Sequence, residues 1–120
     1  MSEPTLDIFR HAKEVEAFTK GQMIVREGDP SGVMYVVVEG EVDIILHDSV
    51  VNSLGPGGIF GEMALVDHQP RSATAVAKTD CKLASIDERR FFFLIQQTPN
   101  FALSVMRVMA SRLRSKDTLV

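Results

Sequence analysis

Short apolar segments cut by glycine and other turn residues run from residue 20 to residue 85, and this pattern limits the chain to few folds. β-Branched residues dominate the segments, and turn residues recur at intervals of roughly 8–12 residues, which is typical of a sandwich or barrel. The simplest solution is an antiparallel double-stranded β-roll, jelly-roll-like in connection. The expected strands lie within residues 23–29, 32–46, 50–60, 71–78 and 81–86, with breaks at Glu39-Gly40 and Thr79-Asp80.

The two ends of the chain have a helical pattern instead. Residues 5–11 suit a short N-terminal helix. From Asp87, a plausible N-cap, the strand signals stop and a helical apolar face begins. Thr98-Pro99 interrupts that helix, and Asn100 can cap a second one that continues to about residue 116. We therefore expect a mainly β fold with flanking helices: a roll over about 14–86 and helices over about 87–115, in one domain spanning 1–120.

The last expected helix is apolar around much of its circumference. Phe101, Val105, Val108 or Met109, and Arg112 follow one another at helical spacing, while Leu103, Met106 and Leu113 lie on other faces. A helix of this kind needs more than one partner surface. Packing on its own roll, a lid over a ligand and a subunit contact in a homodimer all remain open at this point.

Length and composition exclude several classes of protein. A chain of 120 residues, 45% hydrophobic and 24% charged, suits one folded domain. A net charge of −3 argues against a direct nucleic-acid surface, and the basic residues near the end more simply close a helix. The single cysteine, Cys81, cannot form an internal disulfide, and we expect it to be a small buried side chain. No signal core and no run long enough to span a bilayer is present, so we expect a cytoplasmic protein.

The segment "FGEMALVDHQPRSATA", residues 60–75, carries the candidate chemistry. Gly61 opens a short helical turn, whose first N–H groups can bind an anion, and glycine allows close backbone approach. Glu62 would repel a phosphate there by about 4 kcal/mol at 4 Å. This repulsion is avoided if Glu62 points away from the phosphate and accepts a hydrogen bond from a hydroxyl of the same ligand. A sugar phosphate carries both groups.

Arg71 supplies the opposite charge in this segment. A guanidinium binds phosphate through two parallel hydrogen bonds, which lysine cannot do. If Arg71 opens a strand, it shares one face with Ala73, Ala75 and Ala77, and these small side chains would leave a concave surface. The alternative is a structural pair between Arg71 and Glu62 or Asp67.

Several separate segments resemble the cyclic-nucleotide-binding domain family. "GQMIVREGD", "MYVVVEGEVDI", "LGPGGIFGEMAL" and "PRSATAVA" appear in the family's order and spacing, and the helical tail also matches. The chain is similar to catabolite activator protein and kinase regulatory subunits, and above all to bacterial cyclic-nucleotide-gated channels. The resemblance implies that Arg71 contacts a cyclic phosphate and that Glu62 takes the ribose 2′-hydroxyl. It also implies phosphate contacts from backbone N–H groups around Gly61, Met63, Ala64, Ser72 and Ala73.

The resemblance also bears on the purine. It implies that the last helix acts as a lid, with Arg112 at the place where channel-like relatives stack an arginine on the base. Ser72 follows the key arginine, where threonine favours cGMP and alanine favours cAMP in the family. Many bacterial members with serine respond to cAMP, so we expect cAMP as the favoured ligand, with cGMP possible.

Other functions fit the sequence less well. A metal-dependent cupin would need clustered histidines, but His11, His47 and His68 lie far apart, and no nucleophile elbow is present. We therefore expect no enzyme, no metal and no cofactor. A protein-interaction module of the same fold that does not bind nucleotide is a second interpretation. The initial Met-Ser favours a complete small sensor that acts on an unknown effector protein, although a piece of a larger channel or transcription factor, with its effector domain missing, fits as well.

Overall fold

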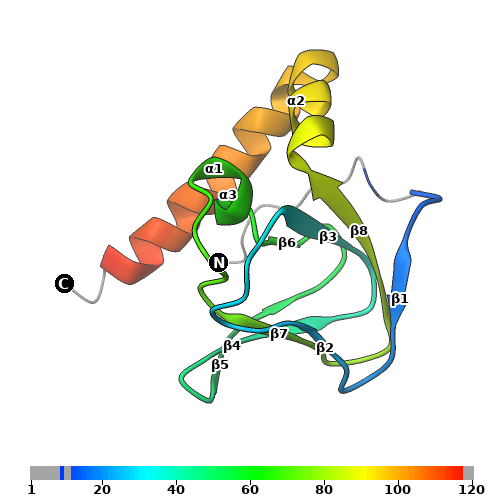
Figure 1. The fold of residues 1–120 in the computed structure, drawn as a ribbon, viewed down its shortest axis with the longest axis vertical. Coiled ribbons are helices and arrows are strands. Elements are labelled where there is room, and N and C mark those ends of the chain that lie inside the picture. Colours follow the sequence, from blue (N-terminus) through cyan, green and yellow to red (C-terminus); the bar gives the residue numbers. More distant parts are fainter. Residues whose placement is uncertain (1–8, 10–11, 118–120) are drawn as a thin grey trace.

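The computed structural model describes residue 9 and residues 12–117 of the chain, and within this part eight strands form two four-stranded antiparallel sheets (Figure 1). The strands are β1 (Glu16–Phe18), β2 (Met23–Val25), β3 (Val33–Glu39), β4 (Val42–Leu46), β5 (Ser49–Leu54), β6 (Ile59–Phe60), β7 (Thr74–Ala77) and β8 (Cys81–Asp87). One sheet has the order β1-β8-β3-β6 and the other β2-β7-β4-β5. The predicted β-roll is confirmed.

Strand β3 explains why the apolar run "VMYVVV" is continuous rather than alternating. Met34 and Val36 are buried on one face, in the core that the sheet shares with the C-terminal helices. Val37 is buried on the opposite face, in the core between the two sheets, where Tyr35 packs at its edge. Because both faces of β3 are covered, neither face is polar.

The predicted breaks at Glu39-Gly40 and Thr79-Asp80 are confirmed, since both lie between neighbouring strands. Gly40 follows β3 with a φ of +85°, and a Cβ there would lie 2.3 Å from the carbonyl oxygen of Asp80. The turn after β3 therefore packs directly on the turn between β7 and β8, and only glycine fits the contact.

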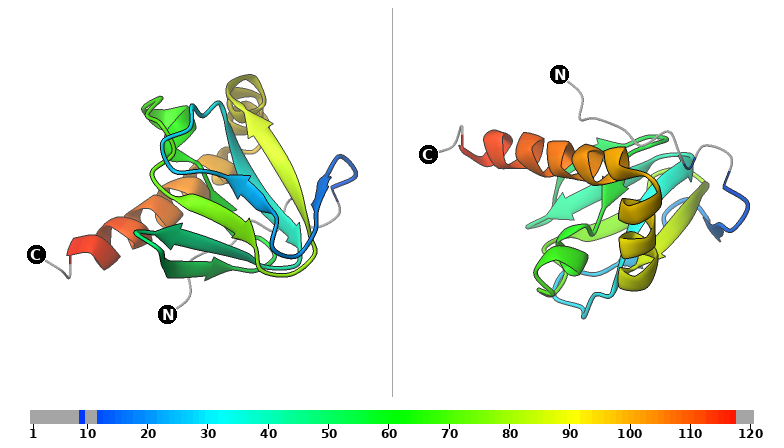
Figure 2. Two further views of the ribbon diagram at one scale, coloured as in Figure 1. Left: turned by 60° about the horizontal axis from the view of Figure 1, so that its bottom comes forward. Right: turned by 90° about the horizontal axis from the view of Figure 1, so that it is seen from above.

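Over the part of the chain that the structure describes, the α-helices are α1 (Met63–Val66), α2 (Glu88–Gln97) and α3 (Pro99–Asp117). Asp87 caps α2 as predicted, with its side chain accepting a hydrogen bond from the N–H of Arg90 at 2.8 Å. Asn100 does not cap α3: that helix already begins at Pro99, a residue whose fixed φ suits a first helical position. Figure 2 shows α2 and α3 meeting at a sharp corner at the Thr98-Pro99 break.

Helix α3 covers the sheet that contains β3. Its buried side chains Phe101, Val105 and Val108 belong to the same core as Met34 and Val36. These three side chains therefore confirm that α3 packs on its own roll. Leu103, Met106 and Leu113 on α3 remain exposed.

The predicted N-terminal helix over residues 5–11 falls almost wholly outside the described residues. Phe9, which is described, is buried in the helix-side core and meets the ring of Phe101 edge-on at 6.2 Å. Among the described residues, no helix is both long and apolar enough to cross a membrane.

Candidate functional site

A tight connection between β6 and α1 forms one side of the candidate site. Gly61 has a φ of +80°, and the single turn of α1 starts two residues later, as predicted for "GEMAL". A Cβ at Gly61 would lie 2.3 Å from Nη1 of Arg71 and 3.1 Å from the carbonyl oxygen of Val33. The missing side chain therefore lets the Arg71 guanidinium lie directly against the backbone that leads into α1.

The backbone of Arg71 is held on both sides by the loop that precedes β3. Its N–H donates to the carbonyl oxygen of Asp29 at 2.9 Å, and its carbonyl oxygen accepts from the N–H of Gly28 at 2.8 Å. These two bonds set where the side chain starts, so Arg71 points into the molecule although it lies outside any strand.

The side chain of Arg71 is buried and incompletely paired. The residue is only 9% exposed, and its Nη1 has no hydrogen-bond partner in the structure. Burial lowers the pKa of Arg71, while Tyr35 and Asp29 oppose that shift. A buried donor without a partner costs about 1–3 kcal/mol, more when it is charged, so such a group calls for an explanation.

Tyr35 lies over the guanidinium of Arg71 and was not singled out from the sequence. The Cζ of Arg71 is 5.9 Å from the centre of the Tyr35 ring. That ring stacks in turn on Phe60, with 5.1 Å between centroids and 25° between planes. Tyr35 is the chain's one tyrosine and lies in a run of valines. A single aromatic phenol in such a run was the feature of the sequence that could have indicated a role at the site.

Glu62 is paired, but not with the arginine that the structural alternative named. It is 4% exposed, and its Oε1 accepts a hydrogen bond from Nη1 of Arg112 at 2.6 Å. The other nitrogen, Nη2 of Arg112, donates to the carbonyl oxygen of Ile59. In the described part of the chain Arg71 forms no ion pair with Glu62 or Asp67, so that alternative is wrong.

The expected strand face shared by Arg71 and three alanines is also wrong. Strand β7 begins only at Thr74, and residues 71–73 form an irregular connection before it. Ala75 and Ala77 are buried between the two sheets and pack in the same core as Val42. They fill the core rather than line a concave surface at Arg71.

The remaining predicted site residues lie close to the two charged ones in sequence. Met63 is 43% exposed in the first turn of α1, and Ala64 follows it in the same helix. Ser72 is exposed and Ala73 is partly buried, both in the connection between Arg71 and β7. The structure therefore gathers the predicted residues at α1, the β7 connection and one point of α3.

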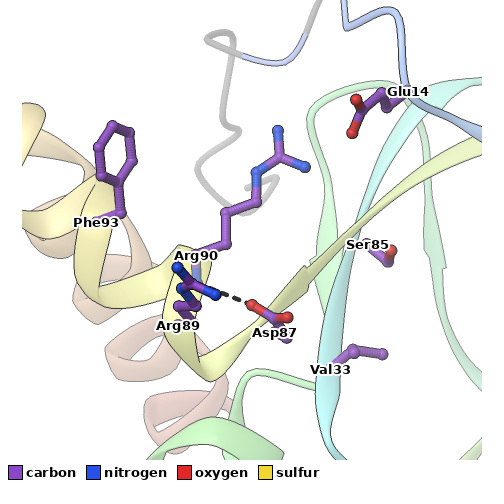
Figure 3. A pocket seen from close by; sticks show the side chains of 7 residues that line it. All are labelled: Glu14, Val33, Ser85, Asp87, Arg89, Arg90 and Phe93. Carbon is purple, nitrogen blue, oxygen red and sulfur yellow. Dashed lines mark hydrogen bonds between the residues drawn. The ribbon is translucent and has the colours of Figure 1, made fainter.

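An open pocket of about 450 Å³ lies elsewhere, at the junction of β8 with α2 (Figure 3). Glu14, Asp87, Arg89 and Arg90 supply two negative and two positive charges to its lining, and Phe93 stands at one side. None of the predicted site residues lines this pocket. Its balanced charge indicates no particular ligand.

The fold defines a β-roll domain with a buried cationic site beside its short helix. Residues 15–98 match the sequence model of the family described as "Cyclic nucleotide-binding domain". This match covers well over half of the chain. The chain belongs to the cyclic nucleotide-binding domain family, and the resemblance noted in the sequence is confirmed.

Two curated relatives, a kinase regulatory subunit and a channel, contain a segment similar to this chain. The chain is 47% identical over 78 residues to a cAMP-dependent protein kinase regulatory subunit of Eremothecium gossypii, covering 65% of this chain and 17% of the relative. It is 43% identical over 82 residues to a cyclic nucleotide-gated potassium channel of Mesorhizobium japonicum, covering 68% and 22%. The chain thus spans about a fifth of the length of these proteins.

Solved structures agree with the family assignment. Thermus thermophilus catabolite activator protein matches with a TM-score of 0.80 and 32% identity, over 93% of this chain and 55% of that one. The EAL enzyme Bd1971 has been solved in cAMP-bound and cGMP-bound forms, which match with TM-scores of 0.64 and 0.65, at 34% and 32% identity. These two matches cover 86% and 88% of this chain and 29% of that enzyme. The domain is a regulatory sensor module rather than a catalytic one.

Proposed function

We propose that this domain binds a cyclic nucleotide between α1 and the connection before β7, and that α3 responds to the binding. The observation that supports this most directly is the buried Arg71, whose Nη1 lacks a partner beside the backbone of Gly61. A cyclic phosphate has two free oxygens and one negative charge, which suit a guanidinium and nearby N–H groups. The ligand would supply the hydrogen bond that Nη1 lacks.

The backbone N–H groups around Gly61 complete the phosphate site in this proposal. Those of Met63 and Ala64 come from the first turn of α1, and those of Ser72 and Ala73 directly follow the arginine. Because the two segments approach each other through the contact between Gly61 and Arg71, one phosphate can reach both.

Glu62 accepts the ribose 2′-hydroxyl, and this role links the ligand to α3. The carboxylate is already bound by Arg112, which lies 50 residues further along the chain. A hydroxyl that donates to Glu62 shares or displaces that bond. Where the hydroxyl displaces that bond, the guanidinium of Arg112 can turn toward the purine, and α3 acts as the lid that passes the signal on.

We propose cAMP as the favoured ligand over cGMP. Ser72 follows Arg71 at an exposed position. Bacterial members of the family that carry serine at this position often respond to cAMP. Calorimetric titration of the purified protein with both nucleotides tests the function. We expect saturable binding of both, tighter for cAMP. Equal affinities would overturn the preference alone. Absence of heat and of competition with a fluorescent cyclic nucleotide would overturn the function and favour an interaction module.

A homodimer through α3 is part of the proposal. Leu103, Met106 and Leu113 are exposed on α3 at spacings of three and seven residues, which resembles a coiled-coil seam. Mass measurement with and without cAMP tests it, with Met106→Glu expected to give monomer and Ser111→Glu as the control. Monomer at every concentration of the unaltered protein would contradict the dimer.

The output of the sensor is proposed to lie in an effector protein or in a neighbouring domain of a longer chain. We also propose a cytoplasmic location. The free, buried Cys81 supports it, since the fold makes no use of a disulfide. Fractionation of cells that express the tagged chain tests the location, and recovery outside the cytoplasmic fraction would contradict it.

A further inference from the structure

The guanidinium of Arg71 needs a support that leaves its hydrogen bonds unused. A free arginine side chain has many rotamers, and ordering them is entropically unfavourable. Most buried arginines are ordered by a carboxylate, but Arg71 forms no ion pair with any described residue. An acid in that place would occupy the N–H groups that a phosphate must bind.

Tyr35 provides such a support through the face of its ring. A cation–π contact attracts the guanidinium but offers no carboxylate oxygen to occupy its N–H groups. The 5.9 Å separation between Cζ and the ring centre lies within the range of a cation–π contact. Burial raises the pKa of Tyr35, so the phenol is neutral at physiological pH and adds no competing charge.

The ring of Tyr35 is itself fixed by the sheet. Tyr35 pairs with Phe60 across β3 and β6 and with Ser85 across β3 and β8, and its ring stacks on the buried ring of Phe60. Phe60 is directly followed by Gly61, against whose backbone Arg71 lies. The four residues Phe60, Tyr35, Arg71 and Gly61 thus form one closed set of contacts that spans three parts of the chain.

We propose that Tyr35 is a positioning residue for the cyclic phosphate: its ring holds Arg71 in place so that the N–H groups of the guanidinium remain available to the ligand. Tyr35 itself makes no contact with the nucleotide in this assignment. The inference rests on the proposed function, because it requires Arg71 to be the phosphate ligand.

A double-mutant cycle on cAMP affinity tests the assignment. Tyr35→Leu should weaken binding roughly 3- to 30-fold, the range expected for a cation–π contact at a partly buried site. Tyr35→Phe keeps a ring and should stay within about twofold of the unaltered protein. In the Arg71→Ala background Tyr35→Leu should change affinity by less than about twofold, because the group that it positions is gone.

A matched control separates positioning from general loss of packing. Val37→Ala alters the same face of β3, two residues away, and Val37 is 1% exposed in the core between the sheets. We expect this variant to lower the melting temperature with little effect on affinity, measured well below that temperature. An equal loss of affinity in Val37→Ala and Tyr35→Leu would overturn the positioning role.

A second measurement is read from the unaltered protein, and a variant serves only to assign the resonance. The Nε–H resonance of Arg71, identified by its loss in Arg71→Lys, should show an upfield ring-current shift in the unaltered protein. A resonance at the position usual for free arginine would overturn the inference. If the unaltered protein binds neither nucleotide, the proposed function fails; if it binds but Tyr35→Leu acts equally with and without Arg71, only the positioning role fails.

Discussion

Arg71 combines burial, charge and an unpaired donor, three properties that together lower the stability of a fold. Its Nη1 is unpaired and the residue is 9% exposed. A residue selected for stability alone would not combine these properties, because an unmet buried donor costs about 1–3 kcal/mol. The combination is expected where a ligand supplies the missing bond.

Arg71→Ala is therefore expected to separate binding from stability. Cyclic-nucleotide affinity should fall at least about tenfold, since truncating one side of a buried charge pair commonly costs about 2–5 kcal/mol. The melting temperature should stay the same or rise, because the substitution removes the buried Nη1 donor that has no hydrogen-bond partner. Arg71→Lys is the control for charge without the planar fork and should also bind weakly. An affinity change below about threefold in Arg71→Ala would contradict its role.

Glu62 is expected to read the ribose, which 2′-deoxy-cAMP tests. This ligand should bind the unaltered protein at least about tenfold more weakly than cAMP, because it lacks a hydroxyl bonded to a carboxylate, worth about 1.5–3 kcal/mol. Glu62→Gln should weaken cAMP binding less than Arg71→Ala does, since the amide oxygen still accepts one bond. The difference in affinity between cAMP and 2′-deoxy-cAMP should be smaller in Glu62→Gln than in the unaltered protein. Equal binding of both ligands to the unaltered protein would show that Glu62 has another role.

At the scale of elements, the start of α2 is set by a few neighbouring residues. Asp87 ends β8 in an extended conformation, and its carboxylate accepts the N–H of Arg90 three residues later. The change from strand to helix at this point thus depends on one local hydrogen bond. This explains why the boundary could be predicted from a single residue type.

Asp87→Ala should lower the stability of the domain by about 1 kcal/mol, the usual value for loss of an N-cap, and its melting temperature by about 4 °C. Asp87→Asn keeps an accepting oxygen and should behave nearly as the unaltered protein does. Thermal unfolding followed by circular dichroism measures both. A drop in Asp87→Asn as large as that in Asp87→Ala would assign the effect to charge rather than to capping.

At the scale of the whole molecule, the pair of Arg112 with Glu62 connects the end of α3 to the candidate site. The start of the same helix is anchored by Phe101, Val105 and Val108 in the core. The buried start and the polar contact near the end leave the C-terminal part of α3 more weakly held than its start. This arrangement suits a helix whose end changes position when a ligand competes for Glu62.

Hydrogen exchange of α3 should therefore depend on cAMP. We expect protection of residues 109–114 to change on binding, while residues 101–108 change less. Arg112→Ala should reduce the difference between the two states, because the contact with Glu62 is lost. Identical exchange of residues 100–114 with and without bound cAMP would contradict the lid.

The strands, turns and helix boundaries were largely predictable because their signals are local. β-Branched runs and the cap at Asp87 act within a few residues of themselves, as does the positive φ of Gly40, and each was found where its pattern indicated. The start of β7 was misplaced for the opposite reason. Strand β7 begins only at Thr74, and the backbone of Arg71 bonds instead to residues 28 and 29, more than 40 positions earlier.

By itself, the sequence determined the β-roll, its family and the two charged residues at the candidate site, because these follow from local patterns and motifs. Only the tertiary structure decided the partners of those charges. Arg112 pairs with Glu62 across 50 residues, and Tyr35 lies over Arg71 from a strand 36 positions earlier. Such contacts depend on how the sheets and α3 pack in space, and no spacing along the chain encodes that packing.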